Sequence, residues 1–106
     1  MEIKGYTLHG DYYLANKVIT NITWKEACEM KEEITLPNGK KVIAHILSKE
    51  ELETIPQEER KCGKWYWTST HDDDVWRVGF NGGFNYNDFN YSPGYGGVRL
   101  GFKNPF

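Results

Sequence analysis

The sequence predicts a single α+β domain over residues 1–106, with two short helices in the first half packed on a small, mostly antiparallel, twisted sheet. Two helix-start motifs lie in the first half, each directly before an apolar stripe at helical spacing. The second half instead alternates large apolar with polar residues at period two, as strands do. A chain of 106 residues has room for one core, and no Pro/Ser-rich linker divides it. A long loop rich in glycine and aromatic residues near the C-terminus completes the expected fold.

Both helix starts are capping boxes. In residues 23–26 (Thr-Trp-Lys-Glu) the threonine hydroxyl can accept from the backbone N–H of the glutamate, whose carboxylate can reach back to the threonine N–H. The apolar stripe that follows predicts a helix that ends near Glu33. Residues 48–51 (Ser-Lys-Glu-Glu) form the second box and predict a helix through Ile55, which the next residue, a proline, ends.

Apolar runs and period-two alternation predict the strands. We expect strands over residues 12–14, 18–19, 42–47, 66–70, 75–81, 84–86 and 98–102. The 42–47 run is nearly continuous in apolar residues, which indicates a central strand. Residues 37–39 (Pro-Asn-Gly) predict a tight turn, and the glycine pair 82–83 predicts a two-residue hairpin turn. Residues 87–97 contain a proline and three glycines, so we expect an ordered loop there.

One face of the predicted strands should form the sheet core. Its expected members are Trp67, Trp76, Val78, Phe80, Val98, Leu100 and Phe102. Few such residues are needed, because each buried aromatic ring removes roughly 150–250 Å² from water. His45 belongs to a strand expected to be buried, so we interpret it as a hydrogen-bonded structural histidine rather than a catalytic one.

Several motifs follow one another in an order that resembles a known family. They are residues 24–27 (Trp-Lys-Glu-Ala), 45–52 (His-Ile-Leu-Ser-Lys-Glu-Glu-Leu), 66–70 (Tyr-Trp-Thr-Ser-Thr), 76–80 (Trp-Arg-Val-Gly-Phe) and 97–102 (Gly-Val-Arg-Leu-Gly-Phe). Together they resemble the bacterial C-type-lectin-like domains of the "YWSS…VR" type, related in fold to formylglycine-generating (sulfatase-modifying) enzymes. The resemblance covers residues 12–102 and implies a C-type-lectin-like fold whose long C-terminal loop region is the ligand face.

The resemblance also bears on the cysteines and on one arginine. Many members carry a cysteine in the last strand or late in the first helix, and this chain departs from that pattern, which favours a reducing compartment. Sulfatase-modifying enzymes need reactive cysteines in the C-terminal half, whereas none follows Cys62, so we expect no such activity. In the family the arginine equivalent to Arg99 is structural, and its five donors suit holding carbonyl or carboxylate groups; ligand binding is the alternative.

Residues 81–97 mix aromatic rings with asparagine and glycine, a composition typical of recognition surfaces. The predicted binding residues are Asn81, Phe84, Tyr86, Asn87, Asn90, Tyr91 and Tyr95, together with Asp72 and Asp73. Some rings, Phe84 and Phe89 among them, could instead close the small sheet. So many rings are hard to bury in a domain of this size, so we expect some of them to be exposed and to contact a ligand.

We therefore expect a non-enzymatic binding module that recognises a protein. Its size and class point to a phage- or mobile-element-encoded inhibitor of a host protein. The alternatives are a carbohydrate- or small-ligand-binding domain, because exposed rings stack on sugars, and a structural or virion-associated component. The net charge of −2 argues against nucleic-acid binding, which needs a basic stripe. No Ser/His/Asp or Cys/His constellation can be assembled from the sequence.

We expect no cofactor, no metal and no membrane span. Residues 71–74 (His-Asp-Asp-Asp) match no calcium loop and are interpreted as a solvated loop tip; a metal site or a charged contact with the partner are the alternatives. Cys28 and Cys62 are expected to be reduced thiols, with a disulfide between them as the alternative. No apolar run approaches the roughly 20 residues that span a bilayer. The N-terminus has no signal-peptide character, so we expect a cytoplasmic protein.

Overall fold

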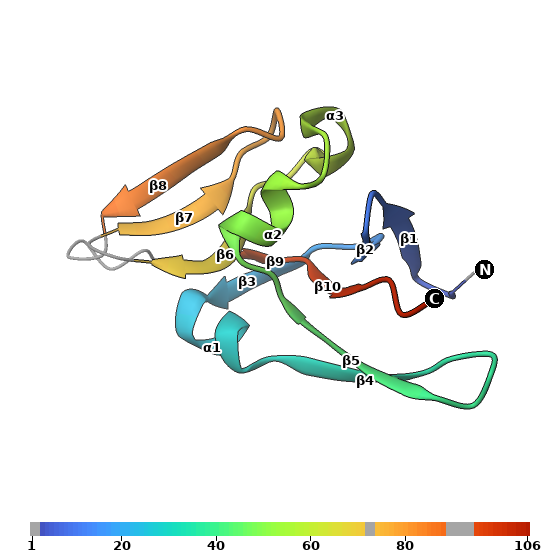
Figure 1. The fold of residues 1–106 in the computed structure, drawn as a ribbon. Coiled ribbons are helices and arrows are strands. Elements are labelled where there is room, and N and C mark those ends of the chain that lie inside the picture. Colours follow the sequence, from blue (N-terminus) through green and yellow to red (C-terminus); the bar gives the residue numbers. More distant parts are fainter. Residues whose placement is uncertain (1–2, 72–73, 89–94) are drawn as a thin grey trace.

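The computed structural model describes residues 3–71, 74–88 and 95–106, whose strands form three antiparallel sheets (Figure 1). The largest sheet has the order β1-β2-β10-β5-β4. Its strands are β1 (Tyr6–His9), β2 (Tyr12–Ala15), β10 (Leu100–Lys103), β5 (Lys41–Ile46) and β4 (Lys31–Thr35). Strands from both ends of the chain lie side by side at its centre, where Gly101 of β10 is opposite Leu14 on one side and His45 on the other.

The two smaller sheets come mainly from the second half of the chain. Their strands are β3 (Ile19–Thr23) with β9 (Tyr95–Val98), and β6 (Tyr66–His71), β7 (Asp74–Val78) and β8 (Phe84–Asp88). The helices of the described residues are short, namely α1 (Trp24–Glu29), α2 (Lys49–Glu53) and α3 (Gln57–Arg60). This arrangement confirms the predicted α+β class with mostly antiparallel sheets. Helix α3 and strands β1, β4 and β9 were not predicted.

Both predicted capping boxes are present. The backbone N–H of Glu26 donates to the hydroxyl of Thr23 at 3.2 Å, and the N–H of Thr23 donates to the carboxylate of Glu26 at 3.1 Å. Ser48 and Glu51 make the same two bonds, at 3.1 and 2.9 Å. Each box satisfies N–H groups that the first helical turn leaves without intrahelical partners, and therefore fixes where α1 and α2 begin.

The first box predicts a pH-dependent contribution to stability. The N–H of Thr23, and then its hydroxyl, hold the pKa of the Glu26 carboxyl below its usual value. A carboxyl with a lowered folded-state pKa adds stability above its unfolded pKa and loses it as pH falls through the folded pKa. We expect Glu26→Gln to lower the urea midpoint at neutral pH, and the difference from the parent to vanish near pH ~2. Equal differences at both pH values would contradict the assignment.

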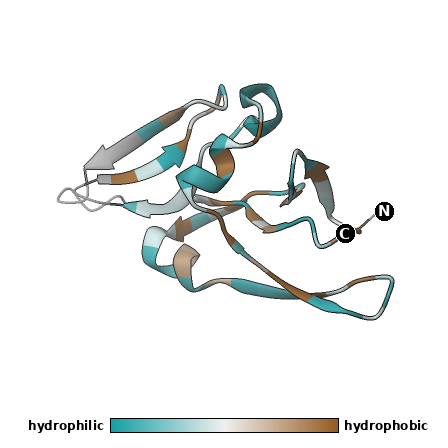
Figure 2. Cartoon of the chain, in the orientation of Figure 1, coloured by the Kyte–Doolittle hydropathy of each residue, from teal (hydrophilic) through white to brown (hydrophobic). Residues whose placement is uncertain are grey.

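The first helix ends at Glu29, so the prediction of a helix up to Glu33 was wrong. Met30 has an extended backbone, with φ −72° and ψ 132°, and strand β4 begins at the next residue. β4 pairs with β5 along its whole length, and the predicted turn at residues 37–39 joins the two strands. The hydrogen bonds of this ladder pair backbone groups of residues 31–35. The strand is therefore more stable here than one more turn of helix. Figure 1 shows the hairpin projecting from the rest of the chain, and Figure 2 shows that it carries both hydrophilic and hydrophobic stretches.

The core lies on both faces of the β6-β7-β8 sheet. Trp67 and Val75 face one cluster of buried side chains, which includes residues of the largest sheet. Tyr66 and Val78 face a second cluster, which includes residues of α2. Five of the seven predicted core residues are buried, namely Trp67, Val78, Val98, Leu100 and Phe102. Trp76 is only half-buried.

Phe80 was wrongly assigned to the core, since its side chain is 64% exposed. Strand β7 ends at Val78, so the period-two pattern stops before Phe80. The prediction of a two-residue turn at residues 82–83 was also wrong, because residues 79–83 all lie between β7 and β8. At both ends of the loop expected over 87–97 the prediction was wrong, because β8 reaches Asp88 and β9 pairs with β3 from Tyr95 onward; residues 89–94 lie outside the described ranges.

Arg99 has the structural role that was expected of it. It lies between β9 and β10, is 6% exposed, and donates from Nε to the carbonyl oxygen of Ala15 at 2.7 Å. Its Nη1 donates to the carbonyl oxygen of Arg60 at 3.1 Å, and the guanidinium lies 5.6 Å from the ring centre of Tyr66. Arg99 therefore joins β2 to the last residue of α3.

Three smaller expectations concern His45, the cysteines and the membrane. The Nδ1–H of His45 donates to the carbonyl oxygen of Ile46 at 2.7 Å, as a structural histidine would. Cys28 and Cys62 are free thiols, both half-buried, and burial raises the pKa of Cys28. Among the described residues, no helix has the length and apolar character that crossing a bilayer requires.

Candidate functional site

The predicted binding residues fall on different surfaces. Asn81 is exposed between β7 and β8. Phe84 faces the opposite way, toward the helices: it lies opposite Val78 in the sheet, and Lys49 Nζ and the Arg60 guanidinium lie 5.3 and 4.5 Å from its ring centre. Tyr86 and Asn87 belong to β8, and Tyr95 begins β9. The remaining predicted residues lie outside the described ranges, namely Asp72, Asp73, Asn90 and Tyr91.

The turn between β7 and β8 presents Phe80. The N–H of Gly79 donates to the carbonyl oxygen of Gly83 at 2.7 Å, and the N–H of Gly82 donates to that of Gly79 at 3.0 Å. Gly82 has φ 84°, the left-handed conformation that three-residue hairpin loops place at this position. The N–H of Gly83 also donates to the side-chain oxygen of Asn81 at 2.9 Å. The turn is therefore closed by its own hydrogen bonds, with the ring of Phe80 pointing into solvent.

Helix α3 holds this turn in place from outside (Figure 1). The Nε of Arg60 donates to the carbonyl oxygen of Gly82 at 2.8 Å, and Nε2 of Gln57 donates to that of Asn81 at 3.2 Å. Arg60 is itself 8% exposed, and its Nη1 donates to the carbonyl oxygen of Ile55 at 2.7 Å. Because both anchors come from a neighbouring helix, the turn is positioned before any ligand arrives.

Beside the turn, Arg77 lies on Trp65. The Arg77 guanidinium is 4.8 Å from the ring centre of Trp65, and its Nε donates to the side-chain oxygen of Asn85. The ring of Trp65 meets that of Trp67 edge-on, with ring centres 4.7 Å apart. Burial lowers the pKa of Arg77, although a guanidinium stays charged in proteins. The contacts with Trp65 and Asn85 therefore fix the orientation of the Arg77 side chain.

Two hollows adjoin Phe80. One, of about 360 Å³, is lined by Trp65, Arg77, Asn81 and Asn85, and the other, of about 290 Å³, extends past Lys64 toward β9. Both are lined by Trp65 and Phe80, so the two hollows adjoin each other. We call this surface the Phe80 face and define it by Lys64, Trp65, Arg77, Phe80, Asn81 and Asn85. It combines two large apolar side chains with amide and cationic groups.

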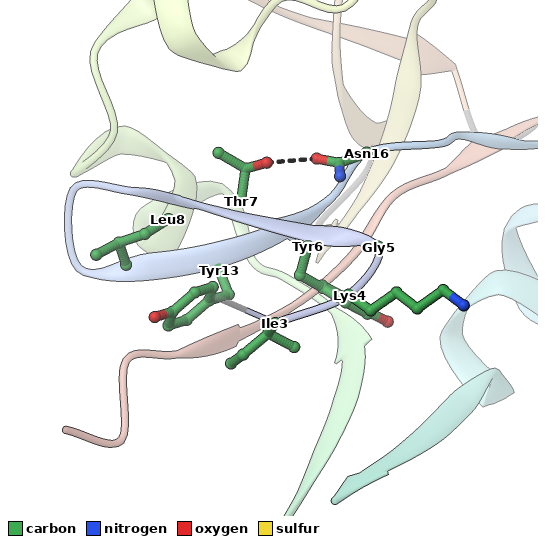
Figure 3. A pocket seen from close by; sticks show the side chains of 8 residues that line it. All are labelled: Ile3, Lys4, Gly5, Tyr6, Thr7, Leu8, Tyr13 and Asn16. Carbon is green, nitrogen blue, oxygen red and sulfur yellow. Dashed lines mark hydrogen bonds between the residues drawn. The ribbon is translucent and has the colours of Figure 1, made fainter. Parts of the chain in front are cut away.

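Larger hollows lie elsewhere, and one of about 770 Å³ is lined by Cys28, Lys31, Ile43, His45, Ile46, Glu51 and Ser69. The one beside β1 measures about 650 Å³ and is lined by Ile3, Tyr6 and Tyr13, which are buried in the core (Figure 3). Lys4 and Leu8 line this hollow as well, and the hydroxyl of Thr7 donates to the side-chain oxygen of Asn16 at 2.6 Å. The described residues contain no group of three His, Cys, Asp or Glu side chains placed to hold a metal.

The local sequence patterns did not predict Trp65, Arg77 and Phe80 as site residues. Phe80 was taken for a strand residue because it continues the alternation of Trp76 and Val78. The sequence did contain a signal for the turn, because Gly79 precedes Phe80 and Asn-Gly-Gly follows it. Such a run of turn-forming residues ends a strand. Trp65 and Arg77 come together only through the pairing of β6 with β7, which no local pattern reveals.

Comparison with known proteins leaves the family open. No family model, no curated protein and no solved structure matches this chain.

Proposed function

We propose that this chain is a non-enzymatic binding module that recognises a protein, and that the Phe80 face is its contact surface. One observation carries the proposal: the ring of Phe80 is 64% exposed on a turn that α3 holds in place. An exposed apolar ring gains free energy when a partner removes it from water. A turn that is already ordered also loses little conformational entropy on binding.

The surroundings of Phe80 also support a protein partner. Trp65 and Phe80 provide apolar area, while Asn81, Asn85 and Lys64 are exposed polar groups at its border. Protein interfaces have this arrangement of an apolar centre inside a polar rim. The sequence-predicted residues Tyr86, Asn87, Asn90, Tyr91, Tyr95, Asp72 and Asp73 stay predicted contacts with the partner. Phe84 stays one as well, although it faces the helices and not the Phe80 face. The C-type-lectin-like fold, the inhibitor role and the cytoplasmic location likewise stay predictions.

A carbohydrate ligand is the weaker candidate, because Trp65 is not free to stack on a sugar. One side of its ring carries the Arg77 guanidinium. The backbone of Gly96 lies against the ring as well, so closely that a Cβ built there would be 2.0 Å from the ring atom Cη2. A glycan array probed with the chain, with and without calcium, should therefore give no signal.

Replacing Phe80 by alanine should remove a binding anchor without disturbing the core. We expect Phe80→Ala to weaken the affinity for a partner purified by capture from cell lysate by about tenfold or more. Ile43→Ala is the matched control, since Ile43 is an exposed apolar side chain, 45% accessible, on the β4–β5 hairpin. The measurement is isothermal titration of each variant with the partner. Equal affinity of the parent and Phe80→Ala would show that the contact surface lies elsewhere.

A further inference from the structure

We infer that the Phe80 face binds an acidic segment of a partner protein, in which a carboxylate pairs with Arg77 and a neighbouring apolar side chain packs on Phe80. This inference rests on the proposed function and adds the chemistry of the ligand to it. Three features carry it: the charge of the face, the fixed orientation of Arg77, and the hollow that Arg77 and Phe80 line together.

The charged groups of the Phe80 face are all cationic. Arg77 and Lys64 line its two hollows, and no described residue that lines them carries a carboxylate. The ion pairs between described side chains involve other residues, namely Lys41, Lys49 and Lys61, and the imidazole of His9 lies 3.3 Å from the carboxylate of Glu59. Because Arg77 and Lys64 form no ion pair with a described side chain, this surface is complementary to a negatively charged group of a partner.

Arg77 is oriented for a carboxylate. Its Nε is occupied by Asn85 and its plane rests on Trp65, while no bond to a described residue uses its two terminal nitrogens. Those nitrogens form a planar fork that matches the two oxygens of a carboxylate. The partial burial of Arg77 strengthens such a pair relative to a fully solvated one. Because stacking already restricts the side chain, binding costs little further rotamer entropy.

The ligand is better described as a protein segment than as a nucleic acid. A nucleic acid would need many cations in a row, whereas this face has two and the whole chain has a net charge of −2. Arg77 and Phe80 line the same hollow of about 360 Å³, which has the size for one acidic side chain beside one apolar side chain. We therefore expect aspartate or glutamate next to a large apolar residue.

The test is a selection of random peptides displayed on yeast, with the full chain as bait. We expect the enriched peptides to carry a carboxylate adjacent to a large apolar residue. Fluorescence polarisation then gives the affinity of a synthetic peptide for four baits: the parent, Arg77→Gln, Phe80→Ala and the control Lys103→Gln, whose lysine is exposed on β10. Arg77→Gln and Phe80→Ala should each weaken binding about tenfold, and Lys103→Gln should not.

A double-mutant cycle separates a direct pair from a general charge effect. Changing the peptide carboxylate to its amide should weaken binding to the parent about tenfold and leave binding to Arg77→Gln unchanged. Raising the salt from ~50 to ~300 mM should weaken the parent complex more than the Arg77→Gln complex. Near-ultraviolet circular dichroism checks that Trp65 keeps its environment in the Arg77→Gln variant.

Different failures have different meanings. Peptides without carboxylates that bind Arg77→Gln as tightly as the parent, but lose affinity for Phe80→Ala, would overturn this inference and leave the proposed function standing. Peptides that bind all four baits equally would overturn both. A selection that enriches nothing over Arg77→Gln would overturn the inference as well, and a glycan-array signal abolished by Phe80→Ala would replace the protein ligand by a carbohydrate.

Discussion

Arg99→Ala should lower the free energy of unfolding by about 3–4 kcal/mol, a large part of the stability of a domain of this size. The substitution removes two short hydrogen bonds from a charged donor, to the carbonyl oxygens of Ala15 and Arg60. Such bonds contribute about 1.5–3 kcal/mol each. The side chain is 6% exposed, so its removal also leaves unfilled space beside the ring of Tyr66.

Two comparison variants make the Arg99 result specific. Arg99→Lys keeps the charge but has no planar fork, so it should recover less than half of the loss. Lys103→Ala removes an exposed cation from the neighbouring strand β10 and should change stability by less than about 0.5 kcal/mol. Urea unfolding monitored by tryptophan fluorescence gives the three values. A loss below about 1 kcal/mol for Arg99→Ala would mean that burying the guanidinium costs as much as its bonds contribute.

Local sequence signals predicted those parts of the fold that local interactions determine. The two capping boxes work within four residues of chain, so Thr23 and Ser48 were assigned correctly. The first three residues of strand β4 were assigned to the helix that the apolar stripe predicts, and its sequence, Lys-Glu-Glu-Ile-Thr, does contain good helix formers. Its conformation is set instead by pairing with β5, a tertiary effect that overrides propensity.

The candidate site also combines features that the local sequence determines with features that tertiary contacts determine. Asn81 was predicted because residues 81–97 have the composition of a recognition surface, and it does lie exposed at the turn. Phe80 was misassigned because alternation does not say where a strand ends. Arg77 stacks on Trp65 across the β6–β7 pair, and Arg60 reaches the turn from a helix that the sequence did not reveal. Sites assembled from three separate elements are therefore beyond a reading of local patterns.

Gly82→Ala should be as damaging as the loss of Arg99, and for a different reason. Gly82 has φ 84°, and a Cβ built there would lie 2.2 Å from the backbone carbonyl oxygen of Gln57. The left-handed conformation costs a residue with a side chain about 1–2 kcal/mol. The clash with α3 must in addition move the turn away from Arg60, which breaks its bond to the Gly82 carbonyl oxygen. We expect a total loss of about 3 kcal/mol.

Gly39→Ala separates the two parts of this cost. Gly39 has φ 86°, and a Cβ built there meets nothing within 4 Å, so its replacement should cost only the conformational part, about 1 kcal/mol. The excess in Gly82→Ala then measures how tightly α3 holds the turn. If that contact positions Phe80, Gly82→Ala should also weaken peptide binding about as much as Phe80→Ala does, while Gly39→Ala should leave it unchanged. Equal stability losses for the two glycine variants, with binding intact, would mean that the turn presents Phe80 without support from α3.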